Sequence, residues 1–332
     1  MSTIPLIDVA PILGPDSGAR TEADMAILAA AGDSGFLVLD GFPPSVPLGA
    51  AVRRDLLRLF ALPDAAKRRL WRRASAPENA NVYRGYFPLS AGVIKEGMDI
   101  GPPGPVPGER GDALTEPTPL PDEDALPDWG ERVREVQAGL EAVGASLMRA
   151  LARGLALPET SFDAAFRGGI STLRMIRYPA WPALAERYGL ALRPLGPGRY
   201  DIGGEHVDSG FVTLLQQDGV EGLQARATDG AWIDVPHVER TLVVNFGKLL
   251  ERWTGGRIRA TPHRVLGNDV PRCSIPFFYE PGVDARIEPL EIEGARPFEP
   301  FTYGDHLWEA MSEFPEFQKA ERFRGAQAIP AD

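Results

Sequence analysis

The second half of the chain alternates short apolar runs with glycine, proline and aspartate, and this alternation constrains the fold more than any other feature. From about residue 168 the runs are STLRMIRYP, FVTLLQQD, GLQARA, WIDVP, TLVVNFG, RIRATPHRVLG and RCSIPFFYEP. Each has the length of a strand and is bounded by residues that favour turns. Many short strands at fairly even spacing predict an antiparallel sandwich or barrel.

The first half is expected to be mainly helical with a few short strands. Residues 46–71 carry apolar side chains at three- and four-residue spacing, which predicts a helix ending near Pro63 and a short helix after it. Residues 101–127 hold eight prolines, so we expect an irregular loop there. A long helix should run from about Pro127 to Leu155, and its apolar side consists of Val133, Val136, Leu140, Val143 and Leu147.

Charge and cysteine content exclude several classes of function. The net charge of -11 is spread along the chain without a basic stripe, so neither nucleic acid nor an anionic membrane surface is an expected partner. Cys273 is the single cysteine, which rules out an intramolecular disulfide and a thiolate metal cluster. The sequence has no run of 18 apolar residues and does not start with a secretory signal. We therefore expect a cytoplasmic protein, with a monomer slightly favoured as its oligomeric state.

A metal site is indicated by the stretch GGEHVDSGFVTLLQQ, in which His206 and Asp208 lie two residues apart just before an apolar run. Residues at this spacing on an extended strand point to the same face. A second histidine, His263, lies in TPHRVLG in the same strand-rich half. Two histidines and one carboxylate form the facial triad that suits ferrous iron and leaves positions open for a cosubstrate and O2. Alone, each histidine is more often a capped turn or a surface residue.

The segment RCSIPFF adds a basis for binding a carboxylate. Arg272 and Ser274 share one strand face and follow His263 after about a strand and a turn. Arginine binds carboxylates bidentately and a serine hydroxyl can add a further hydrogen bond. An arginine that points inward near a metal needs an anion, because an unpaired buried charge is unfavourable.

Taken in order, HVDSGFVTLL, GLQ, VVNFG, PHRVL and RCSIPFF resemble the isopenicillin N synthase-like branch of the iron(II)/2-oxoglutarate-dependent oxygenases. IPLIDV, DSGFLVLDGF, LFALPDAAKRRL and YRGYFPL extend the resemblance over the first half. The resemblance implies an α+β fold with a mainly β core, a double-stranded β-helix (a distorted jelly roll) with an N-terminal helical extension. It implies iron ligation by His206, Asp208 and His263, a carboxylate clamp of Arg272 and Ser274, and help from Tyr178 in holding the same carboxylate. Asn245 matches a recurrent core position, which we interpret as structural.

The same resemblance divides the chain into four regions. We expect an N-terminal non-haem dioxygenase region at 1–125, central helices at 126–167, the jelly-roll core at 168–285, and a closing helix and tail at 286–332. The closing helix should span about residues 303–313. Residues 180–205 form a long insertion before His206 that is expected to act as a lid.

The resemblance implies Fe(II), 2-oxoglutarate and O2 as cofactor and cosubstrates, and hydroxylation, desaturation or ring closure of a small organic metabolite as the reaction. Isopenicillin N synthase itself acts without 2-oxoglutarate, and IRYP and SIPFF look close to that relative. An oxidase with a substrate carboxylate in the clamp therefore stays open, as do a zinc hydrolase and a non-catalytic binding module.

Several cationic residues are candidates for the substrate lining, and they would suit an acidic substrate. They are Arg84, beside Tyr83, and Lys95, Arg174 and Arg177. The alternative, that these side chains are solvated or paired with Glu96 and Asp99, is equally open.

Overall fold

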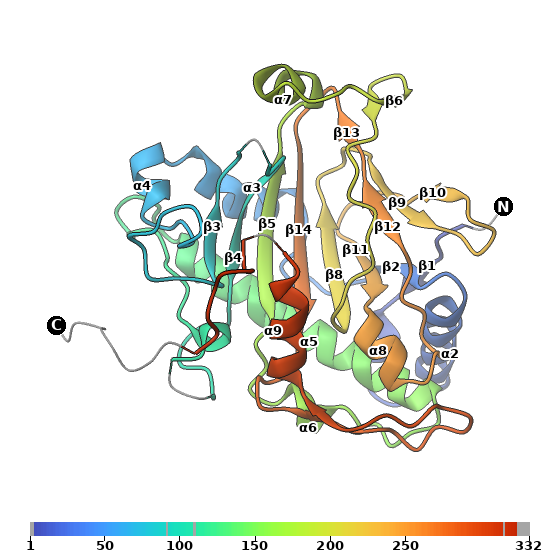
Figure 1. Cartoon of the computed structure of the whole chain (residues 1–332). Helices are drawn as coiled ribbons and strands as arrows, with labels where there is room; N and C mark the ends of the chain where they lie inside the picture. Colours follow the sequence, from blue (N-terminus) through green and yellow to red (C-terminus); the bar gives the residue numbers. More distant parts are fainter. Residues whose placement is uncertain (1–2, 91, 109–110, 315, 324–332) are drawn as a thin grey trace.

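A large sheet forms the centre of the computed structural model, which describes residues 3–90, 92–108, 111–314 and 316–323. Eight strands follow the order β1-β2-β11-β8-β14-β5-β4-β3 (Figure 1). All neighbours are antiparallel except β1 and β2, which are parallel. Their bounds are β1 Leu6–Asp8, β2 Phe36–Asp40, β3 Gly85–Phe87, β4 Glu96–Ile100, β5 Thr172–Tyr178, β8 Val212–Gln217, β11 Leu242–Phe246 and β14 Arg272–Tyr279.

A smaller antiparallel sheet packs against one face of the large sheet, which we call the inner face. Its order is β10-β9-β12, with β9 at Leu223–Arg226, β10 at Trp232–Asp234 and β12 at His263–Val265. An apolar cluster joins the two sheets and includes Val38, Leu215 and Val243 from the large sheet and Leu223 and Ala225 from β9. The mainly β core, a double-stranded β-helix within an α+β chain, is confirmed.

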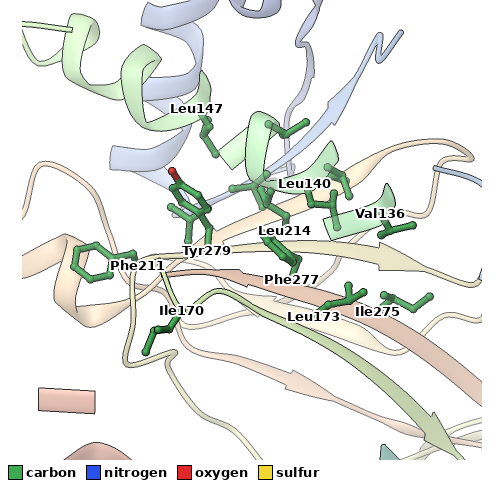
Figure 2. Close-up of a cluster of buried hydrophobic side chains, with 14 of the residues drawn as sticks. Val136, Leu140, Leu147, Ile170, Leu173, Phe211, Leu214, Ile275, Phe277 and Tyr279 are labelled. Carbon is green, nitrogen blue, oxygen red and sulfur yellow. The ribbon is translucent and has the colours of Figure 1, made fainter. Parts of the chain in front are cut away.

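The outer face of the large sheet is covered by the helix α5, Trp129–Gly154, close to the bounds expected from the sequence (Figure 1). Its apolar positions recur every three or four residues and so form one stripe. Figure 2 shows Val136, Leu140 and Leu147 of this stripe beside strand residues such as Phe277 and Tyr279. Gly144 is required at this contact, because a Cβ there would lie 2.6 Å from the Tyr279 ring.

The N-terminal extension adds further helices around α5. The helix α2, Gly18–Asp33, packs on α5, and Ser17 caps its start by accepting a hydrogen bond from the Arg20 N–H. The expected helix up to Pro63 and the short one after it are present as α3 Ala50–Leu57, η1 Arg58–Ala61 and α4 Asp64–Arg68. The proline-rich segment contains one short helical turn, η2 Ala113–Thr115, and its residues 109–110 lie outside the described part.

Two helices depart from what the sequence indicated. The apolar run after β1 forms α1, Ala10–Leu13, because Pro11 suits the first turn of a helix. The insertion at 180–205 contains α7, Trp181–Tyr188, followed by a small sheet of β6 Pro194–Gly196, β7 Arg199–Tyr200 and β13 Gly267–Asn268. Periodicity was uninformative in runs as short as these.

Five further elements complete the described part of the chain. They are α6 Asp163–Phe166, α8 Lys248–Trp253, β15 Arg286–Ile287, β16 Phe301–Thr302 and the closing helix α9 Tyr303–Ser312. In the described ranges no helix is both long and apolar enough to cross a membrane.

Candidate metal centre and carboxylate clamp

The side chains of His206, Asp208 and His263 meet at one end of the space between the two sheets. Asp208 Oδ1 lies 3.5 Å from His206 Nε2 and 3.7 Å from His263 Nε2. One ligand atom from each residue can be chosen so that all three lie within 4.8 Å of one another. The structure thus brings together the three residues that the sequence singled out.

A pair of backbone hydrogen bonds explains how two distant segments converge here. The His206 N–H donates to the His263 carbonyl over 3.0 Å, and the His263 N–H donates to the His206 carbonyl over 2.9 Å. This isolated bridge attaches residue 206 to the edge strand β12 of the small sheet. It places the two imidazoles side by side, with ring centroids 4.3 Å apart.

Both histidines have one ring nitrogen fixed by a backbone carbonyl. Nδ1 of His206 lies 2.8 Å from the Gly204 oxygen, and Nδ1 of His263 lies 3.2 Å from the Thr261 oxygen. Because a carbonyl oxygen can only accept, each Nδ1 carries the proton. Each Nε2 then has a free lone pair directed toward Asp208, which is the tautomer that metal ligation requires.

The Asp208 carboxylate is oriented by two neighbours from the inner face of the large sheet. Its Oδ2 accepts hydrogen bonds from Thr213 Oγ1 over 2.6 Å and from Asn245 Nδ2 over 2.7 Å. Oδ1 is left facing the two histidines. Sequence reasoning interpreted Asn245 as structural and did not identify Thr213. The two residues lie opposite each other on β11 and β8.

The pKa shifts of Asp208 and His263 suit ligation, whereas Asp208 raises the pKa of His206 despite the opposing effect of burial, so a metal has to displace a proton there. Burial acts to raise the pKa of Asp208, but His206, His263 and Thr213 outweigh this effect and hold it well below its usual range. Burial lowers the pKa of His263. A carboxylate that is ionised and an imidazole that is neutral at pH 7 are the forms that bind a metal. Two imidazole nitrogens and one carboxylate oxygen fit a divalent first-row metal with open positions.

Arg272 and Ser274 lie on the inner face of β14, and both are buried. Arg272 is opposite Tyr178 of β5, and its guanidinium lies 5.6 Å from the centroid of that ring. Its Nε donates to the Val220 carbonyl over 3.3 Å, but Nη1 and Nη2 are buried with no hydrogen-bond partner among the described residues. Two unpartnered guanidinium nitrogens fit a carboxylate, the group that can accept from both.

The triad and this clamp lie toward opposite ends of β8. Thr213, at the start of the strand, contacts Asp208, whereas Gln217, at its end, is opposite Ser274. An extended molecule with a carboxylate in the clamp would therefore lie along the inner face and direct its other end to the triad.

Of the other residues considered from the sequence, Lys95 lies next to the clamp, with Nζ 5.9 Å from the centroid of the Tyr178 ring, and the following four do not belong to the triad or the clamp. His237 is 3.6 Å from Glu239, and His306 of α9 contacts the Phe301 ring. Arg174 and Arg177 pair with Asp99 and Glu96, as the alternative interpretation expected.

Comparisons with known proteins show the family to which the chain is related. Residues 177–281 match the 2OG-Fe(II) oxygenase superfamily, and residues 4–123 match the family described as non-haem dioxygenase in morphine synthesis N-terminal. The chain is 30% identical over 320 residues to isopenicillin N synthase of Streptomyces clavuligerus, covering 92% of this chain and 93% of that protein. It is 28% identical over 330 residues to a homoarginine-6-hydroxylase of Oryza sativa subsp. japonica, with 92% and 95% covered.

Solved structures of similar fold include proteins of the same family. The crystal structure of a full-length Neurospora crassa protein in complex with alpha-KG and thymine is similar, with a TM-score of 0.76 and 28% identity, covering 93% of this chain and 96% of that one. A putative 2OG-Fe(II) oxygenase family protein from Caulobacter crescentus shares the fold, with a TM-score of 0.75 and 24% identity over 95% of this chain and 100% of that one.

Proposed function

The chain belongs to the 2OG-Fe(II) oxygenase superfamily, an oxidoreductase family that needs Fe(II), 2-oxoglutarate and O2, and we propose that it hydroxylates a C–H bond of a small organic metabolite. The observation that carries the proposal is the pairing of a two-histidine, one-carboxylate triad with a buried arginine whose two terminal nitrogens have no partner among the described residues. When bound, iron supplies the redox chemistry by which O2 converts 2-oxoglutarate to succinate and CO2 and delivers one oxygen atom to the substrate.

In this proposal His206, Asp208 and His263 hold the iron from one side. Thr213 and Asn245 keep the Asp208 carboxylate oriented through its second oxygen. The Gly204 and Thr261 carbonyls fix the two imidazoles in the ligating tautomer. The chain therefore supplies a preformed set of ligands before any ion binds.

The clamp holds the carboxylate of 2-oxoglutarate that lies away from the metal. Arg272 offers two donors, Ser274 a hydroxyl, and Tyr178 an aromatic face over the guanidinium. Because Arg272 is buried, its attraction for a carboxylate is weakly screened by water. The same burial excludes water from the bound cosubstrate.

A second candidate is an oxidase that acts without 2-oxoglutarate and places a substrate carboxylate in the clamp. The 30% identity to isopenicillin N synthase over most of the chain favours it. Both functions use the same triad and clamp, so an experiment on the cosubstrate has to separate them.

Anaerobic titration of the iron(II) protein with 2-oxoglutarate tests the proposal. We expect a weak visible charge-transfer band on binding and release of succinate after O2 is admitted. Iron binding without the band and without succinate would favour the oxidase. Metal analysis after anaerobic purification separates both from a zinc enzyme.

Arg272→Ala should raise the KM for 2-oxoglutarate on the order of 100-fold while leaving iron affinity unchanged, because it removes a charge-assisted pair remote from the metal. Arg286→Ala, which alters an exposed arginine on β15, is the matched control and should keep the wild-type KM. Normal cosubstrate use by Arg272→Ala would refute the clamp assignment.

A further inference from the structure

Two arginines share one buried carboxylate on the inner face of the large sheet, beyond the clamp. Arg174 of β5 binds Asp99 of β4 bidentately, with Nη2 2.7 Å from Oδ2 and Nε 2.5 Å from Oδ1. Arg72, which is 3% exposed, contacts the same carboxylate. A single Asp99 cannot neutralise two guanidinium groups, so the cluster holds one positive charge in excess.

Two acidic groups lie around this cluster, one exposed to solvent and paired with Arg72, the other buried. Glu316, half-exposed and following α9, lies 3.5 Å from Arg72 Nη1. Glu280 is buried beside Thr172, and burial raises its pKa to about 7 against the opposing effects of Arg84, Tyr303, Thr172 and Arg174. Burial and the neighbouring Arg174 lower the pKa of Arg72 to about 9. A further anion at this point would therefore be stabilised.

Arg174 is the member of the cluster that a ligand can reach. Its side chain is 24% exposed, whereas Asp99 is 4% exposed. Within the described residues, no hydrogen bond or ion pair involves its third nitrogen, Nη1. Arg84 differs, because it donates to Thr172 and, over 2.7 Å, to the Ile170 carbonyl.

The position of Arg174 relative to the triad follows from strand register. Its guanidinium lies 5.2 Å from the centroid of the Phe278 ring. Phe278 is opposite Thr213, which donates to Asp208. The path from Arg174 to the triad therefore crosses β14 to β8, and the two strand spacings between β5 and β8 set a lower limit of about 10 Å on its length. Phe87 and Phe278, both partly exposed, supply apolar surface beside the guanidinium.

We infer that Arg174, backed by Asp99 and Arg72, binds a carboxylate of the substrate, so that the substrate is a carboxylic acid with an apolar body. Its acid group lies at least two strand spacings, about 10 Å, from the carbon that reacts. This inference rests on the proposed function, because it places the substrate between Arg174 and the triad. It assigns the substrate acid to a site separate from the Arg272 clamp.

The test is a calorimetric comparison of acids with their neutral amides. The probes are phenylacetate, 3-phenylpropanoate and 5-phenylpentanoate, each beside its primary amide. They are titrated anaerobically into the iron(II) protein saturated with 2-oxoglutarate, so that the clamp is already filled. We expect at least one acid to bind about tenfold or more tightly than its amide, since charged hydrogen bonds to guanidinium are strong.

Variants then locate the preference for acids. Arg174→Gln should abolish it, and Arg174→Lys should restore part of it, because lysine keeps the charge but loses the bidentate geometry. The matched control is Arg177→Gln. Arg177 lies on the same strand and pairs with a buried carboxylate, Glu96, but its guanidinium lies over the Phe60 ring of the outer core. This control should keep the wild-type preference.

The outcomes separate this inference from the proposed function. If 2-oxoglutarate binds normally but acids and amides bind equally, or no probe binds, the acid site is wrong and the proposed function stands. If Arg174→Gln and Arg177→Gln lose the preference for acids over amides to the same extent, the acid site is also refuted. If 2-oxoglutarate fails to bind, the proposed function is refuted. The acid site is then still tested by comparing the preference for acids over amides in these two variants.

Discussion

The two faces of the large sheet use the same strands for opposite purposes. On β14, Ile275, Phe277 and Tyr279 point to the outer face and pack in the core against α5 (Figure 2). Earlier on the same strand, Arg272 and Ser274 point inward and are buried without joining that core. Because side chains alternate along a strand, one sequence can carry a stabilising row and a reactive row at once.

The neighbouring strand β5 repeats the division. Leu173 and Met175 belong to the outer core, whereas Arg174 and Tyr178 lie on the inner face. Buried polar groups cost stability unless they are paired, and Arg272 keeps two unpartnered nitrogens among the described residues. The comparison shows that apolar packing on the outer face stabilises the fold enough to offset the cost of burying unpaired polar groups on the inner face.

The largest effect expected on the inner face is loss of the metal. His206→Ala removes one of three ligands and should abolish iron(II) binding, measured by anaerobic metal titration. The unfolding free energy of the metal-free protein should change little, because this side chain is half-exposed. His237→Ala is the control and should bind iron normally. Retained iron in His206→Ala would disprove the triad.

The largest effect expected on the outer face is loss of stability. Phe277 is fully buried, so Phe277→Ala should lower the free energy of unfolding by about 4 kcal/mol, measured by denaturant titration. Its neighbour Phe278 points inward and is partly exposed, so Phe278→Ala should cost less. Equal losses in the two variants would remove the distinction between the faces.

A pH-dependent effect is expected at Glu280, whose pKa burial raises from 4.5 to about 7. The folded state favours the protonated acid, so its contribution to stability is complete below pH 4.5 and disappears as the pH rises through 7. The shift corresponds to about 3 kcal/mol, which Glu280→Gln should remove from the profile of unfolding free energy against pH. Glu239→Gln should change the pH profile of the unfolding free energy in the opposite direction, because Arg53 lowers the pKa of Glu239. A Glu280→Gln profile parallel to the wild type would contradict this account.

The smallest effect expected is on metal affinity. Asn245→Ala removes one of the two hydrogen bonds to Asp208 Oδ2 and should weaken iron(II) binding about 10- to 100-fold. Thr213→Val removes the other bond with little change in shape and should act in the same direction. Iron affinity unchanged in both variants would show that the carboxylate does not need these neighbours.

Much of this division could be predicted from the sequence, because alternation along a strand is a local property. The apolar stripe of α5 follows from spacing alone, whereas the His-x-Asp and Arg-x-Ser pairs stand out by their spacing and are given their roles by the resemblance. The roles of Thr213 and Asn245 could not be predicted, because they depend on which strands become neighbours. The same limit applies to Arg72, which meets Asp99 and Arg174 through tertiary packing rather than any local pattern.

Because of the backbone bridge between His206 and His263, retention of the ion depends on the edge strand β12 of the small sheet. Each ligand residue donates its N–H to the other, so local opening of β12 separates both imidazoles in a single event. An ion bound to both histidines stabilises the closed form by mass action and so opposes local opening of β12. Amide hydrogen exchange at these two positions should therefore slow when metal binds, and the fraying rate of this edge sets an upper limit on how long the ion stays.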